Sequence, residues 1–136
     1  MVNGMKAFLA GLFLSALLGG TQSFAAVATQ TTQTNSGGGV TVKVTRLDSS
    51  PGGDLRFRVV LDTHSVNLDG YDLNRVIVLR DAATNVYHPA SVENKGSGHH
   101  REATVTFAKP KNNKRIELVM KGIAGVHERV FQWELE

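Results

Sequence analysis

The sequence predicts an all-β fold: a seven-stranded antiparallel β-sandwich of the immunoglobulin-like kind. Apolar residues recur at every second position in short runs, and clusters of Gly, Pro, Asn, Asp and Ser separate these runs. No run after residue 39 has the 3.6-residue period of an amphipathic helix. Seven short strands in about 100 residues is typical of an immunoglobulin-like sandwich. The expected strands are residues 40–45, 55–61, 76–79, 86–92, 103–107, 116–120 and 131–135.

The alternation assigns a role to each strand in turn. Residues 40–45 alternate valine with Thr and Lys, and residues 55–61 alternate apolar residues with arginine, so each strand buries one face. Residues 76–79 are apolar throughout, which predicts a central strand covered on both sides. Residues 86–92 contain Pro89, which cannot donate a backbone hydrogen bond and therefore predicts an edge strand. The last strand faces the core with Phe131, Trp133 and Leu135.

Cysteine is absent, which bounds both the fold and the chemistry. The cysteine pair of antibody-type domains is missing, and the single Trp lies in the last strand, so a small jelly roll or a partly open barrel remains an alternative. Disulfides, thiolate metal sites and covalently attached haem are excluded. The formal net charge of +3 at pH 7 is too small to predict binding to nucleic acid or to membranes.

Residues 1–26 are expected to be a cleaved signal peptide. Lys6 precedes an apolar run at residues 7–18, and small residues follow. A spanning helix needs about 20 apolar residues, so a retained membrane anchor is the less favoured alternative. We therefore expect export to the periplasm or the extracellular space, with no membrane span after cleavage. Residues 27–39 are polar and glycine-rich, which predicts a flexible leader before a β-sandwich domain at residues 40–136.

Four of the five histidines fall in loops that should lie at one end of the sandwich. If consecutive strands run up and down, every second connection lies at the same end. By this count the three longer connections, residues 62–74, 93–101 and 122–128, share one end. They contain His64, His99, His100 and His127.

These histidines suggest a metal site. Imidazole is the commonest metal-binding side chain, and a site without cysteine uses nitrogen and oxygen donors. The candidate metal ligands are His64, His99, His100 and His127, with Asp62 as a further ligand or as a partner that orients one of them. This donor set suits Zn²⁺ or Cu²⁺. Neighbouring side chains of a strand point to opposite faces, so only one of His99 and His100 is expected to ligate. Alternatively, the histidines face solvent or hydrogen bond within their loops.

Other chemistry has less support. Residues 67–72 place Asn and Asp around a Gly like part of a calcium loop, but the closing Glu is absent and calcium is not expected. Ser65 follows His64 without the strained turn of a nucleophile, and no carboxylate pair is suited to acid–base catalysis. We therefore expect a protein that is not an enzyme.

Three segments carry a resemblance to known proteins: VVLDTHSVNL at residues 59–68, GHHR at 98–101 and ERVFQW at 128–133. They resemble a family of small exported bacterial β-sandwich domains of unknown function, which implies an exported domain over most of residues 40–135. In outline the chain is also similar to periplasmic copper-carrier proteins. It departs from them because it lacks their methionine-rich copper(I) motifs, and Met120 is the only methionine after residue 5.

The leading functional prediction is an exported, non-catalytic β-sandwich whose histidine-rich loop end binds a divalent transition metal, Cu or Zn. The alternative is a structural or protein-interaction module of the cell envelope or extracellular space that contacts another protein and binds no metal. The basic turn at residues 109–115 has no exposed aromatic residues beside it, so nucleic-acid binding is not expected. The sequence leaves the oligomeric state open.

Overall fold

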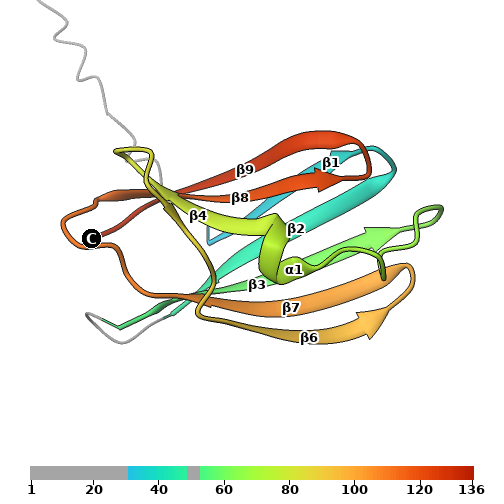
Figure 1. Ribbon diagram of the computed structural model, residues 1–136, viewed down its shortest axis with the longest axis horizontal. Helices are drawn as coiled ribbons and strands as arrows, with labels where there is room; N and C mark the ends of the chain where they lie inside the picture. The colour runs from blue at the N-terminus through green and yellow to red at the C-terminus, as the bar shows by residue number, and fades with distance from the viewer. Residues whose placement is uncertain (1–30, 49–52) are drawn as a thin grey trace, which may run out of the picture.

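Two antiparallel sheets make up the part of the protein described by the computed structural model, residues 31–48 and 53–136 (Figure 1). The strand order is β1-β2-β3-β7-β6 in the first sheet, called sheet A, and β5-β4-β8-β9 in the second, called sheet B. The predicted all-β class is confirmed. Sheet A contains β1 (Thr32–Gly37), β2 (Val40–Leu47), β3 (Leu55–Thr63), β6 (Ser91–Ser97) and β7 (His100–Phe107). Sheet B contains β4 (Ile77–Asp81), β5 (Val86–Tyr87), β8 (Arg115–Ile123) and β9 (Val126–Glu134), and a single helical turn, α1 (Leu73–Val76), precedes β4.

Both sheets contribute to one hydrophobic core. Alternate residues of the strands are buried, as the period-two pattern predicts, and Phe57 of β3 and Phe131 of β9 are at most 1% exposed. The ring centroid of Phe57 lies 6.1 Å from that of Phe107 in its own sheet and 5.0 Å from that of Trp133 in sheet B. Aromatic contacts of this kind join the sheets directly, in a chain that has no disulfide.

The predicted count of seven strands was wrong, because the described residues contain nine. Residues 86–92 were predicted as one edge strand, but the chain crosses there from β5 in sheet B to β6 in sheet A. Pro89 lies in the crossing, where its missing N–H group interrupts no ladder of hydrogen bonds. The β4–β5 turn and the β6–β7 turn lie at opposite ends of the domain, so the crossing does not reverse the chain (Figure 1). The split of the predicted strand therefore does not affect the prediction that the connections at residues 62–74, 93–101 and 122–128 share one end.

The other additional strand is β1, and the prediction of a flexible leader was wrong for residues 32–39. Gly38 and Gly39 have φ of 60° and 78°, the left-handed conformations that a tight two-residue hairpin requires. The inward-facing side chains of β1 are polar, yet they have partners on β9. The amide of Gln33 donates to Gln132 O (2.5 Å) and accepts from Gln132 N (3.1 Å), and Asn35 Oδ1 accepts from Arg129 Nη1 (2.8 Å).

The predicted signal peptide and residues 27–30 lie outside the described residues. Within residues 31–48 and 53–136, no helix has the length and apolar character needed to cross a membrane.

Candidate functional site

The candidate site begins where β3 ends, at Thr63. The Thr63 hydroxyl donates to Gly39 O (2.7 Å) in the β1–β2 hairpin. The same oxygen accepts from Ser65 N (3.2 Å) and Val66 N (3.1 Å). A threonine hydroxyl in this position closes a tight side-chain turn, which stops the strand and leaves the next residue, His64, exposed to solvent.

The β3–β4 loop then packs against the β6–β7 turn. Thr63 N donates to His99 O (3.0 Å), and Leu68 N donates to Gly98 O (2.9 Å). In return, Gly98 N donates to Asp69 Oδ1 (2.8 Å). Leu68 is fully buried and anchors the loop in the core. Because backbone groups of both segments are paired, His64 and His99 are carried on two connections that are held at a fixed separation.

Arg101 reinforces this junction, and no sequence pattern singles it out beyond its place in the GHHR segment. Its Nη1 donates to Leu68 O (2.8 Å) and to Tyr71 O (2.7 Å), and its Nη2 donates to Asn94 Oδ1 (2.9 Å). The Tyr71 hydroxyl in turn accepts from Ala124 N (2.9 Å) in the β8–β9 turn. The prediction that these three connections share one end is therefore confirmed.

His100 and Asp62 form a hydrogen-bonded pair at this end. They are direct cross-strand neighbours of β7 and β3, and His100 Nδ1 contacts Asp62 Oδ1. An ionised carboxylate can only accept, so in a pair with ionised Asp62 the Nδ1 atom is the donor, and a neutral imidazole in this pair has its lone pair on Nε2. A carboxylate that holds the other ring nitrogen in this way is the usual arrangement behind a metal-ligating histidine.

A shallow pocket of about 280 Å³ unites most of the predicted ligands. Asp62, His64, His99 and His100 all line it, together with Gly39, Thr41 and Thr63. His127, the remaining predicted ligand, lies exposed on β9 and does not line this pocket. In the described part of the chain, no three His, Asp or Glu side chains are close enough together to hold a metal ion as they stand.

The oxygen-rich stretch at residues 67–72 is engaged in local structure. Asn67 Oδ1 accepts from Asp69 N (3.0 Å), and Asp72 Oδ1 accepts from Asn74 N (3.0 Å) at the start of α1. Asp69 is bonded to Gly98 as described above. These side chains act as turn and cap residues. The loop still contributes negative charge, because residues 64–72 contain two aspartates and neither Lys nor Arg.

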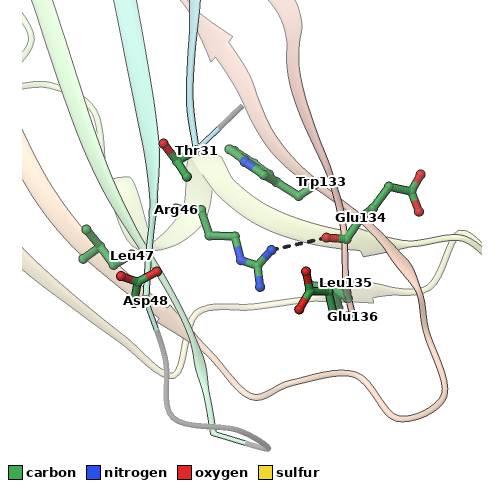
Figure 2. A pocket seen from close by; sticks show the side chains of 8 residues that line it. All are labelled: Thr31, Arg46, Leu47, Asp48, Trp133, Glu134, Leu135 and Glu136. Atoms are coloured by element: carbon green, nitrogen blue, oxygen red, sulfur yellow. Dashed lines mark hydrogen bonds between the residues drawn. The ribbon is translucent and has the colours of Figure 1, made fainter. Parts of the chain in front are cut away.

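A larger cavity of about 350 Å³ lies at the opposite end of the domain, between the ends of β2 and β9 (Figure 2). Arg46 reaches across it and donates to Glu134 O (3.2 Å). Thr31, Asp48 and Trp133 also line it, and no histidine does. Among the described residues that line it, Arg46 is the single cation beside several carboxylates, so this lining does not match the donor set predicted for the metal.

Comparisons with protein-family models, with curated proteins and with solved structures found no match to this chain. The resemblance drawn from the three segments therefore stays a prediction.

Proposed function

We propose that the chain is an exported, non-catalytic β-sandwich domain of the immunoglobulin-like kind that binds a divalent transition-metal ion, Cu²⁺ or Zn²⁺. The proposed ligands are His100, through Nε2, with His64 and His99, while Asp62 orients His100. Strand alternation led us to expect only one of His99 and His100 as a ligand, but His99 lies in the turn before β7, where that alternation does not apply, and both line the pocket. The single observation that carries this proposal is the Asp62–His100 pair on the wall of a pocket that His64 and His99 also line. Export is supported by the signal-peptide pattern of residues 1–26.

Binding requires the side chains of His64 and His99 to turn toward His100. Both residues are exposed, so their rotamers can change without disturbing the core. Their backbones are held by the hydrogen bonds of Thr63 and Leu68, so the loops need not rearrange. Three imidazoles with water at the open position suit Zn²⁺ or Cu²⁺. The absence of thiolate, and the presence of only one methionine after residue 5, disfavour Cu⁺. His127 is outside the proposed ligand set.

The first test measures binding of Cu²⁺, Zn²⁺ and Ca²⁺ to untagged protein lacking residues 1–26, by calorimetry and by thermal unfolding. An ion that binds only the folded state stabilises it by about 2.7 kcal/mol at 100 times its dissociation constant. We expect one equivalent of Cu²⁺ or Zn²⁺ to bind and Ca²⁺ to have no effect. His100→Ala should abolish the stabilisation, and Asp62→Asn should weaken binding by about tenfold or more through loss of ring orientation.

His88→Ala is the matched control, because His88 is exposed in the crossing between β5 and β6 and does not line the pocket. This variant should bind the ion like the unchanged protein. Equal affinity in His100→Ala and the unchanged protein would contradict the proposed site, and the absence of any binding would contradict the metal function.

A structural or protein-interaction module is the second candidate function. It is favoured by the edge of sheet A at β6, where six of the seven residues are exposed. Envelope or extracellular proteins are the partners expected for an exported domain of this kind.

A further inference from the structure

The edges of the two sheets differ in how they are protected. On one side of the domain, side chains of sheet A bond to the backbone of β9: Gln33 at Gln132 and Arg46 at Glu134. On the other side, β5 is only two residues long, whereas β6 has seven residues and is the last strand of sheet A. Among residues 31–48 and 53–136, no element lies beyond β6 in the plane of the sheet (Figure 1). An exposed edge strand of this length is a template for another strand.

The sequence of β6 is self-complementary about its central residue, Asn94. Reading outward, Glu93 stands on one side of it and Lys95 on the other, followed by Val92 and Gly96 and then by a serine at each end. An antiparallel pairing with a two-fold axis at Asn94 places residue 93 opposite residue 95. We propose that β6 pairs with β6 of a second copy of this chain, so that Glu93 of each copy faces Lys95 of the partner subunit.

The register within sheet A puts both charged residues on the same face. Glu93 is the neighbour of Thr104, and Lys95 is the neighbour of Glu102, whose side chains lie on the outer face of β7. Glu102 also forms two hydrogen bonds with Arg58 of β3 (2.8 and 2.9 Å). In the dimer, the alternating series Arg58, Glu102 and Lys95 is therefore continued by Glu93 of the partner subunit. Opposite charges at facing positions of neighbouring strands stabilise the pairing.

The inner face of β6 permits the same arrangement. Val92 is partly buried against the core, and the residue that would face it, Gly96 of the partner subunit, has no side chain. Asn94 is fixed by its bond to Arg101. A single seven-residue edge buries much less than the roughly 1,600 Å² of a standard interface, so the dimer is expected to be weak and concentration-dependent. This inference is independent of the proposed metal site.

Charge reversal provides the test, because a two-fold axis makes the two substitutions compensate each other. Sedimentation of the metal-free protein up to about 1 mM should show a reversible dimer of the weak class. Glu93→Lys and Lys95→Glu each place like charges opposite one another twice, and each should raise the dimer dissociation constant about tenfold or more. The double variant, Glu93→Lys with Lys95→Glu, should return it to within about threefold of the original.

Lys43→Glu is the matched control. It changes the net charge as Lys95→Glu does, on an exposed position of the same sheet face, but β2 lies on the far side of β3 and β7 from the edge. It should leave dimerisation unchanged. All three charged residues are exposed, and thermal unfolding checks that each variant is folded. A protein that stays monomeric throughout, or a double variant as weak as the single variants, overturns the proposal.

Discussion

Arg129 is a fully buried cation, 1% exposed, that has no carboxylate partner in the described structure. Its guanidinium donates to neutral oxygens: Asn35 Oδ1 (2.8 Å), Gly37 O (2.7 Å) and, at 3.4 Å, Ile123 O. Its Nε atom has no hydrogen-bond partner within the described residues. Burial lowers the pKa of this guanidinium from its ordinary value, because the charged form loses its hydration. Arg129 thus serves three acceptors, one on a side chain and two on the backbone.

Removing the Arg129 side chain should destabilise the folded protein. Arg129→Ala removes the hydrogen bonds to acceptors of β1 and β8 and opens a cavity, and we expect a loss of about 2–4 kcal/mol in the free energy of unfolding. Arg46→Ala removes an arginine with one hydrogen bond at the rim of the opposite cavity and should cost less than about 1 kcal/mol. Urea unfolding of both variants measures the difference. Equal losses would mean that the buried network contributes nothing specific.

The period-two pattern of β9 indicates that Arg129 faces the core, although the charge of an arginine suggests an exposed position. Phe131 and Trp133 face the core, and stepping back by two along the strand places Arg129 on the same face. The interpretation stopped at the apolar residues, because a buried arginine is rare unless it has partners. Two of its three partners, Asn35 and Gly37, lie in β1, more than 90 residues earlier, and no local sequence pattern predicts them. Asp62 was predicted as a ligand or as a partner of one histidine, but the choice of His100 depends on the register of β3 against β7, which the sequence does not reveal.

At the scale of elements, β1 shows why a polar segment can be a strand. Its inward side chains are amides that satisfy the backbone and the arginine of β9, so it needs no apolar face. The hairpin that returns it to β2 is packed against another turn. A Cβ atom added to Gly38 would lie 2.2 Å from Ala124 O in the β8–β9 turn.

This close approach distinguishes Gly38 from Gly125, although both glycines have a left-handed backbone conformation. Gly38→Ala should destabilise the protein by the conformational cost of about 1–2 kcal/mol plus the displacement of the β8–β9 turn. Gly125→Ala, with φ of 75° and open space around its Cβ position, should cost only the conformational part. Thermal unfolding of the two variants measures the gap. If Gly125→Ala is as damaging as Gly38→Ala, the contact between the turns is not what requires glycine.

At the scale of the whole molecule, Asp81 joins the turns at the end opposite the histidines. Its carboxylate accepts from the side chain and backbone of Asn85, from Tyr87 Oη, from Ala83 N and from Asn113 Nδ2. These hydrogen bonds, above all the one from the Asn85 side chain, lower the pKa of Asp81. Ion pairs with Arg80 and Arg58 lower the pKa values of Glu117 and Glu102 in the same direction.

A carboxylate whose folded-state pKa is depressed stabilises the protein above its unfolded pKa of about 4, and the contribution disappears as the pH falls through the folded pKa. We therefore expect the urea midpoint to fall steadily from pH 5 to about pH 2. Asp81→Asn should lower the midpoint at pH 7, and its deficit should shrink at low pH. A deficit that is the same at pH 7 and about pH 2 would show that the charge of Asp81 does not contribute.

Much of the architecture was accessible from the sequence. Period-two alternation gave the all-β class and the inward residues, and counting connections placed the histidine loops at one end. The crossing at residues 88–90 was missed, since a strand that changes sheets keeps its local pattern and differs only in its partners. His127 shares the predicted end but not the pocket, because a loop count does not specify side-chain positions within an end.

The link between β1 and β9 also sets an order of events. Asn35 and Gly37 precede Arg129 by 94 and 92 residues. At a synthesis rate of about 5–20 residues per second, β1 leaves the ribosome roughly 5–20 seconds before its buried donor exists. Throughout that interval β1 can pair with β2, but its inward amides have nothing on sheet B to bond. Of the described strands, β1 is synthesised first, yet its hydrogen bonds to sheet B can form only after β9, the last strand, has been synthesised.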